Sequence, residues 1–407
     1  MNFIAKSFIL ILCAFVLVFA ADEKPCLILI SFDGFRWDYP NLGITPNLDK
    51  IRANGVKALS FQSVFPSKTF PNHYSIVTGL YPQNHGIVTN HFENEFTGEM
   101  YRLGDTSSVR SDKWYHGETI WATAKKQGIR TASYFWPGSE TALDYKHPDY
   151  FHHYDENISY DTRIQGVIDW LKLPESERPH MILLYFEETD TYGHRSGPLS
   201  ERNLQAISLL DTKLGLLSEK LDEINLGKKV NIILVSDHGM TDISPEKIVV
   251  LKDYFPNEIP PYFGSGPMVQ FYEADLDKQN KIYSALKKHE HNFKVYHRSE
   301  IPEYFHYNAS PFIGDIVVIA EPGYSIIEDR EVLVKAGANY SRGNHGWDNH
   351  MLDMHGIFYA IGPAFKAGYQ CGTLLNIDIY PLMCKILEII PNQNIDGDLS
   401  RIEFLLK

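Results

Sequence analysis

Three short apolar segments of the chain each end next to acidic residues. The acidic residues Asp33, Asp190 and Asp237 lie at or just beyond the ends of residues 26–32, 181–186 and 231–236. In an open α/β sheet, the ligand crevice lies beyond the carboxyl ends of the parallel strands. If the segments are such strands, their carboxylates meet at one edge of a sheet. That arrangement is typical of a divalent-metal site.

Histidines accompany these carboxylates. His194 follows Asp190 by four residues, His238 directly follows Asp237, and His355 lies in a late segment. An aspartate at a strand end is usually a turn residue that bonds its own backbone, and a lone histidine is usually structural. Acidic residues at three strand ends with histidines near two of them favour a divalent metal, above all zinc. Calcium prefers more oxygen ligands, and a structural zinc site prefers thiolates.

A threonine supplies the candidate nucleophile. Thr69 lies two residues before Pro71, and the apolar residues that follow predict that a helix begins here. One interpretation makes Thr69 a helix cap. The other places its hydroxyl at the positive end of a helix, where an attacking oxygen and a bound phosphate are favoured. A metal that lowers the pKa of the hydroxyl would favour the second interpretation.

The elements that must position these side chains alternate along the chain. The three apolar segments are short and rich in Ile, Leu and Val, as parallel strands covered on both faces are. Helical periodicity runs over 204–224 and ends before Gly227, and a second helix is predicted over 118–126. Such alternation predicts an α/β fold whose mostly parallel sheet carries helices on both faces.

Composition and targeting signals set the domain organisation. The chain has 407 residues, 44% hydrophobic, with 38 basic against 51 acidic residues and a net charge of −13. These values exclude a disordered or fibrous protein and disfavour binding to a nucleic-acid duplex. Residues 1–20 are predicted to be a secretory signal peptide, and an uncleaved membrane anchor is the alternative. We expect one catalytic domain over 21–407 with a small subdomain at 256–320, no membrane span in the mature chain, and secretion.

Cysteines and glycosylation sequons fit an exported protein. After removal of the signal peptide, at most one disulfide can form among the remaining cysteines, Cys26, Cys371 and Cys384. Which of them pair is left open. Three Asn-x-Ser sequons are candidate glycosylation sites: Asn157, Asn308 and Asn339. Pro311, directly after the second sequon, disfavours its use.

Several motifs follow one another along the whole mature chain. They are Asp33-Gly34-Phe35-Arg36, Thr69-Phe70-Pro71-Asn72-His73, Thr78-Gly79-Leu80-Tyr81-Pro82, His85-Gly86-Ile87 with Asn90, Phe135-Trp136-Pro137-Gly138, Asp190 with Gly193-His194, Ser236-Asp237-His238-Gly239-Met240, and His355. In this order they resemble the nucleotide pyrophosphatase/phosphodiesterase family of the alkaline phosphatase superfamily. The resemblance implies an alkaline-phosphatase-like core.

The resemblance also implies a mechanism. One zinc ion would be held by Asp33, Thr69, Asp237 and His238, and a second by Asp190, His194 and His355. Two such ions can stabilise the attacking and leaving oxygens of an in-line displacement at phosphorus. Thr69 would form a covalent intermediate, and Asn90 would donate to a phosphate oxygen.

The resemblance further implies a substrate slot. Phe70 and Tyr154 would enclose a base, with Trp136 as a wall, whereas His91 stands where better-known members carry lysine. The predicted function is a secreted zinc phosphodiesterase that hydrolyses nucleotides or dinucleotide polyphosphates to nucleoside 5′-monophosphates. The alternatives are a choline- or phospholipid-directed phosphodiesterase and a catalytically weak binding protein. The oligomeric state is not predicted.

Overall fold

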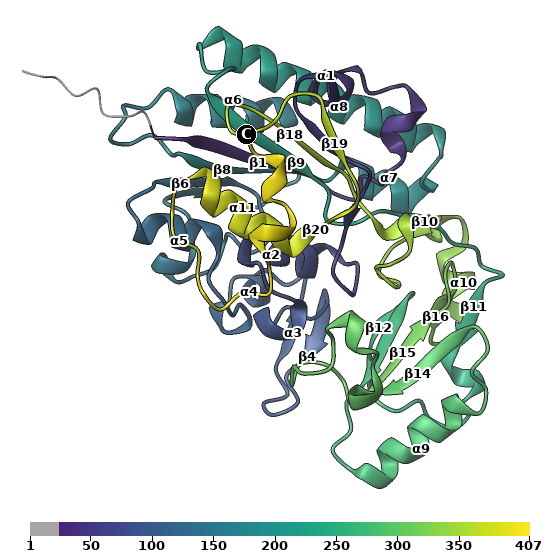
Figure 1. The fold of residues 1–407 in the computed structure, drawn as a ribbon. Coiled ribbons are helices and arrows are strands. Elements are labelled where there is room, and N and C mark those ends of the chain that lie inside the picture. The colour runs from purple at the N-terminus through teal and green to yellow at the C-terminus, as the bar shows by residue number, and fades with distance from the viewer. Residues whose placement is uncertain (1–23) are drawn as a thin grey trace, which may run out of the picture.

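An eight-stranded sheet forms the centre of the computed structural model, which describes residues 24–407 (Figure 1). The predicted signal peptide, residues 1–20, lies outside the described residues. The strand order is β19-β2-β18-β9-β1-β8-β6-β7. The strands are β1 (Cys26–Phe32), β2 (Val56–Ala58), β6 (Thr131–Tyr134), β7 (Tyr150–His152), β8 (Met181–Phe186), β9 (Val230–Val235), β18 (Phe358–Ile361) and β19 (Tyr369–Cys371). Within this sheet only β18 runs antiparallel to its neighbours, β2 and β9.

The three predicted strands lie side by side in matching register. Leu29 of β1 is paired with Leu183 of β8 and with Ile233 of β9. Because the three strands are parallel, their carboxyl ends reach the same edge of the sheet. The mostly parallel α/β fold predicted from the sequence is therefore confirmed, and the acidic residues that follow these strands are brought together.

Alternate residues of each central strand enter two different cores. Leu27 and Leu29 pack in one core, while Ile28 and Ile30 pack in the other. Helices cover both faces of the sheet (Figure 1). One face carries α1 (Pro46–Asn54), α6 (Tyr160–Leu171) and α8 (Glu201–Glu223), and the other carries α2 (Thr69–Thr78), α5 (Ile120–Lys126) and α11 (Ile379–Ile386). This double cover explains why the central strands are apolar throughout.

Both helices predicted from periodicity are present. The pattern over 204–224 belongs to α8, which begins at Glu201 and is capped by the Ser200 side chain. The segment 118–126 belongs to α5, which begins at Ile120 because the Thr119 side chain caps it.

A smaller antiparallel sheet lies beside the main one, at the lower right of Figure 1. Its strand order is β12-β13-β15-β14 and α9 packs against it; the bounds are β12 (Tyr262–Ser265), β13 (Met268–Phe271), α9 (Leu276–Lys287), β14 (Phe293–His297) and β15 (Ile316–Ala320). Its core also takes in Leu251, Trp347 and Met354, which lie outside 256–320. That 256–320 forms a subdomain of its own stays a prediction.

Short elements connect these layers. Four two-stranded ladders pair β3 (Phe61–Gln62) with β20 (Leu374–Leu375), β4 (His91–Glu93) with β5 (Met100–Arg102), β10 (Thr241–Asp242) with β17 (Gly343–Asn344), and β11 (Ile248–Val250) with β16 (Ser325–Ile327). The remaining α-helices are α3 (Pro82–His85), α4 (Thr106–Val109), α7 (Glu188–Ser196) and α10 (Glu331–Ala336). The β10–β17 ladder matters for function, because it brings the chain from the smaller sheet back beside α7.

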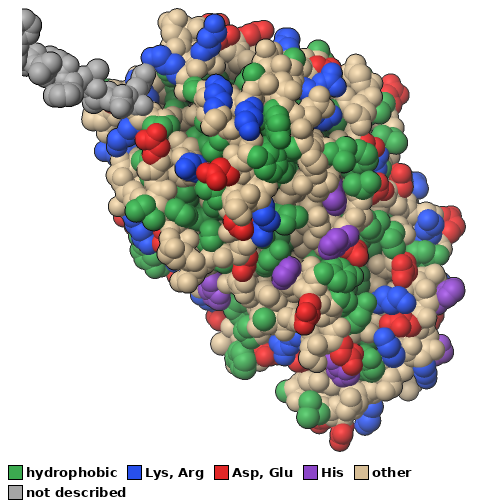
Figure 2. All heavy atoms as spheres, in the orientation of Figure 1, with side chains coloured by type: hydrophobic (Ala, Val, Ile, Leu, Met, Phe, Trp, Pro, Cys, Tyr) green, Lys and Arg blue, Asp and Glu red, His purple; other side chains and the backbone are tan. Residues whose placement is uncertain are grey.

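The cysteines, the lack of a membrane-spanning helix among the described residues and the surface charges bear on the predicted export. Among residues 24–407 the thiols of Cys26, Cys371 and Cys384 are unpaired, and burial raises the pKa of Cys26 and Cys384 to about 12. No helix in this part of the chain is long and apolar enough to cross a membrane. Acidic and basic side chains are interspersed over the face drawn in Figure 2.

The sequons differ in accessibility. The side chains of Asn157 and Asn339 are exposed, whereas Asn308 is half-buried and its backbone N–H donates to Gln83. Glycosylation stays a prediction, and the geometry favours the two exposed asparagines.

Candidate active site

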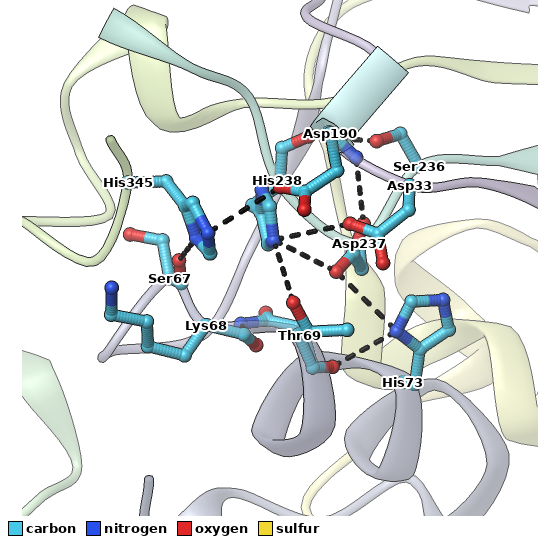
Figure 3. Close-up of polar contacts among 12 residues, drawn as sticks. Asp33, Ser67, Lys68, Thr69, His73, Asp190, Ser236, Asp237, His238 and His345 are labelled. Carbon is cyan, nitrogen blue, oxygen red and sulfur yellow. Dashed lines mark hydrogen bonds and ion pairs between the residues drawn. The ribbon is translucent and has the colours of Figure 1, made fainter. Parts of the chain in front are cut away.

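The first cluster of ligand-type side chains forms where β1 and β9 end. Asp33 follows β1, and Asp237 and His238 follow β9. The Nε2 atom of His238 lies 3.0 Å from an oxygen of Asp237 and 3.4 Å from an oxygen of Asp33. All three side chains are buried, and Figure 3 shows them lying together. We call Asp33, Asp237 and His238 the first group.

A second cluster lies beside the first. Helix α7 places Asp190 and His194 one turn apart on the same helix face, with 3.4 Å between the carboxylate and Nε2. His345 completes the cluster, with its Nε2 3.1 Å from Nε2 of His194 and 3.5 Å from Oδ1 of Asp190. We call Asp190, His194 and His345 the second group. The stacked rings of His238 and His345, 3.5 Å apart, join the two groups (Figure 3).

All three histidines present the same ring nitrogen to the site. In each ring Nδ1 lies within hydrogen-bond distance of a main-chain carbonyl oxygen: 2.8 Å for His238, 2.9 Å for His194 and 2.7 Å for His345. A carbonyl can only accept, so Nδ1 carries a hydrogen, and when the ring is neutral Nε2 offers its lone pair. Burial, together with neighbouring positive groups, lowers the pKa of His345 well below its usual value, so this ring is neutral. This orientation is the one found in metal-binding histidines.

The carboxylates add unsatisfied acceptors. One oxygen each of Asp33, Asp190 and Asp237 is buried with no hydrogen-bond donor. Burying such an oxygen costs several kcal/mol unless a donor or a cation compensates. These oxygens face imidazole lone pairs, so a divalent cation in each group would satisfy both. The donor set of carboxylate oxygens and imidazole nitrogens fits zinc.

The pKa shifts show how closely the charges are packed. Burial, reinforced by the charges of Asp237 and Asp190, raises the pKa of Asp33 well above its usual value. Burial also favours the neutral form of Asp237, but the adjacent His238 and His73 rings outweigh burial and lower the pKa of Asp237. The pKa values of two acidic side chains in contact thus shift in opposite directions, as expected when two carboxylates share a buried site and repel each other.

His355 does not belong to the second group, so the prediction for this residue is corrected. The structure places His345 there instead. Both ring nitrogens of His355 are occupied elsewhere: Nδ1 lies 2.9 Å from the Ser60 hydroxyl and Nε2 lies 3.0 Å from the Asn349 carbonyl. Burial lowers the pKa of His355 to about 4, so it is a neutral, buried structural side chain.

A local signal for His345 is present in the sequence. The residue lies in Gly343-Asn344-His345-Gly346. Gly346 has a φ of +115°, and a Cβ atom there would collide with the Lys68 side chain. The same logic applies to Gly239 beside His238, where a Cβ would meet the Asp353 backbone. A histidine next to a glycine that allows close backbone packing is shared by both sites, but it also occurs at His355-Gly356, where a Cβ would meet the Ser236 backbone, so this signal does not single out His345.

The Thr69 hydroxyl does not cap α2 and faces the first group instead. Thr69 is the first residue of α2, while Lys68 occupies the cap position without a side-chain capping bond. The hydroxyl of Thr69 lies 3.2 Å from Nε2 of His238 and points into the first group (Figure 3). His73, one turn later, links the helix to the first group, because its Nδ1 lies 2.9 Å from the Thr69 carbonyl and 3.3 Å from Asp237. Sequence analysis gave His73 no role of its own.

Asn90 has a fixed amide orientation. Its side-chain oxygen accepts the backbone N–H of Phe70 at 3.2 Å, and a backbone N–H can only donate. The amide NH₂ is therefore left free to donate to a bound anion. His91 packs edge-on against Phe263 of β12, with ring centroids 5.2 Å apart.

An aromatic cavity of about 290 Å³ opens beside Thr69. Phe70, Trp136, Tyr154 and Tyr185 contribute to its walls. Tyr154 is 46% exposed, whereas Trp136 is fully buried and donates its indole N–H to the His73 carbonyl. The three aromatic residues predicted for the substrate slot thus line one cavity, which also contacts Asp33 and Asp190.

The chain is similar to known phosphodiesterases in sequence. Residues 27–348 match the model of the type I phosphodiesterase/nucleotide pyrophosphatase family. A venom phosphodiesterase of Crotalus durissus collilineatus is 36% identical over 402 residues, which are 95% of this chain and 47% of that protein. Human ectonucleotide pyrophosphatase/phosphodiesterase family member 1 is 34% identical over 95% of this chain and 42% of its own length. The chain spans about half the length of the curated relatives it matches.

Solved structures are also similar. Human ectonucleotide pyrophosphatase/phosphodiesterase 5 superimposes with a TM-score of 0.87 at 32% identity, covering 94% of this chain and 100% of that one. An inactive threonine-to-alanine variant of the murine protein, solved in complex with AMP, gives the same TM-score, identity and coverage.

Proposed function

Because the chain belongs to the type I phosphodiesterase/nucleotide pyrophosphatase family, we propose that it is a secreted zinc-dependent hydrolase of phosphodiester and pyrophosphate bonds. Its substrates are extracellular nucleotides or dinucleotide polyphosphates, and its products include nucleoside 5′-monophosphates. The observation that carries the proposal is the hydroxyl of Thr69, which points into the first of two adjacent groups of metal-type ligands beside an aromatic cavity.

The ligand assignment follows from the two groups. Asp33, Asp237 and His238 would hold one zinc ion together with the Thr69 hydroxyl, and Asp190, His194 and His345 would hold the other. Bound zinc ions supply charge stabilisation for the attacking and leaving oxygens at phosphorus and lower the pKa of a bound hydroxyl or water.

The chain's own residues carry the displacement. The Thr69 oxygen gives its proton to solvent and forms a bond to phosphorus, while the bond to the leaving oxygen breaks and that oxygen departs with the electron pair, which gives a nucleotidyl-threonine. Water then attacks the same phosphorus and the threonine–phosphorus bond breaks; the water oxygen stays on phosphorus with one hydrogen, and the other hydrogen restores the Thr69 hydroxyl. The Asn90 amide donates to a non-bridging phosphate oxygen, and the N-terminus of α2 favours the negative charge there.

The aromatic cavity supports a nucleotide substrate. Phe70 and Tyr154 line it next to the nucleophile, and aromatic rings stack on any base because every base has a π face. The relatives named as nucleotide pyrophosphatases and the murine AMP complex add support.

Metal removal is the direct test of the proposal. Chelation is expected to abolish hydrolysis of a nitrophenyl nucleotide monophosphate, and zinc is expected to restore it better than magnesium. The purified protein should contain about two zinc ions per chain, since two ligand groups are present. Full activity in excess chelator, with no bound metal, would refute the proposal.

Removal of one stacking ring tests the substrate class. Tyr154→Ala is expected to raise KM for nucleotide substrates by roughly 5- to 150-fold, because one aromatic–base contact is worth about 1–3 kcal/mol. A small phosphate ester without a base should be affected little. Tyr145→Ala is the matched control, since Tyr145 is also exposed but lies outside the cavity. Faster cleavage of phosphorylcholine esters by the unchanged protein would favour the choline-directed alternative.

A further inference from the structure

Tyr185 contacts both the aromatic cavity and the first group. We propose that Tyr185 is a positioning residue that holds Asp33 in the orientation in which this carboxylate binds metal. The inference rests on the proposed zinc function and assigns to Tyr185 a role separate from the wall of the substrate cavity. In the sequence Tyr185 has the pattern of an ordinary residue of a buried strand.

The hydrogen bond between the two side chains carries the inference. The Tyr185 hydroxyl donates to Oδ2 of Asp33 at 2.5 Å. The other oxygen, Oδ1, is buried without a donor and lies 3.4 Å from Nε2 of His238. Fixing one oxygen of a carboxylate fixes the direction of the other. The Tyr185 hydroxyl therefore turns Oδ1 toward the position that a metal would share with His238.

The strand pairing makes this contact rigid. Tyr185 is paired with Ser31 in the β1–β8 ladder, and the backbone N–H of Asp33 donates to the Phe186 carbonyl at 2.9 Å. The Tyr185 carbonyl accepts from the buried guanidinium of Arg163 at 2.9 Å. The hydroxyl thus reaches Asp33 from a backbone that is held on both sides.

Packing confines the ring itself. Tyr185 is buried, and its ring meets those of His73 and Tyr154 edge-to-face, with centroids 5.3 Å and 6.3 Å away. A phenylalanine would keep these contacts and the cavity wall. Tyr185→Phe therefore removes the bond to Asp33 and little else.

The expected result is a change in zinc affinity. Loss of an outer-shell partner of a metal ligand typically lowers metal affinity 10- to 100-fold. Tyr185→Phe should therefore lose its zinc to a chromogenic chelator at a chelator concentration roughly 10- to 100-fold lower than the unchanged protein needs. At limiting zinc its kcat should fall, and excess zinc should restore it. KM for a nitrophenyl nucleotide should stay within about twofold, because the cavity wall is unchanged.

Tyr160→Phe is the matched control. The Tyr160 hydroxyl also donates to a carboxylate at this edge of the sheet, Glu188, at 2.6 Å, but Glu188 belongs to neither ligand group. This variant loses the same kind of bond and should keep the zinc affinity of the unchanged protein. Thermal unfolding of both variants without metal monitors any general loss of stability.

Each other outcome has a distinct meaning. Unaltered zinc affinity in Tyr185→Phe would overturn the inference and leave the proposed function standing. An equal loss of zinc in Tyr160→Phe would also overturn it, because the effect would then be general. If the unchanged protein bound no zinc, the proposed function would fail and the inference with it.

Discussion

Replacing Thr69 with alanine is expected to lower kcat by several orders of magnitude while the protein still folds. The hydroxyl is the only group of this side chain that points at the first group, and α2 does not use it as a cap. If Thr69 were only a helix cap, its replacement would lower the free energy of unfolding by about 1 kcal/mol and leave kcat nearly unchanged. Steady-state kinetics and thermal unfolding of the same preparation separate the two interpretations.

Two further measurements sharpen this test. Thr69→Ser should keep part of the activity, because the hydroxyl survives. After a rapid acid quench with a substrate labelled at the α-phosphate, the unchanged protein should carry covalent label and Thr69→Ala should carry none. An alanine variant that turns over at a near-normal rate would contradict the covalent mechanism.

The second large effect is expected at His345. His345→Gln removes a ligand of the second group, so the protein should lose about one of two zinc ions. Its kcat should fall by at least about a hundredfold, since a catalytic metal supplies several kcal/mol of transition-state stabilisation. Zinc content by elemental analysis and kcat at saturating substrate are the measurements.

His355→Gln is the control for that variant. Its side chain is buried and bonded to Ser60 and Asn349, so the substitution should cost about 1–3 kcal/mol of stability and leave the zinc content unchanged. The reverse pattern, with zinc lost in His355→Gln and kept in His345→Gln, would restore the sequence-based assignment.

These two histidines mark the limit of what could be predicted from the sequence. Asp33, Asp190 and Asp237 could be located because each follows a short apolar strand, and parallel strands bring their carboxyl ends to one edge. His194 and His238 are close to them in sequence. His345 follows no strand of the main sheet and reaches the second group only through the β10–β17 ladder.

Tyr185 was hidden for a different reason. A tyrosine inside a buried apolar strand has the pattern of a core residue, and its polar contact with Asp33 spans 152 positions of the chain. Periodicity describes which face a side chain occupies but not which atom its hydroxyl meets. The parallel core of the fold could therefore be predicted, whereas contacts between the ends of different elements required the structure.

The position of β18 has a consequence for how the protein is made. β2 is held to the sheet only between β18 and β19, although β2 emerges from the ribosome long before either of them. Residues 56–58 therefore cannot form their native strand pairing until residues 358–361 have been synthesised and have paired with β9. A nascent chain stalled before that point would expose one edge of β9 and leave β2 unpaired, which makes it a ready target for chaperones and for association with another stalled chain.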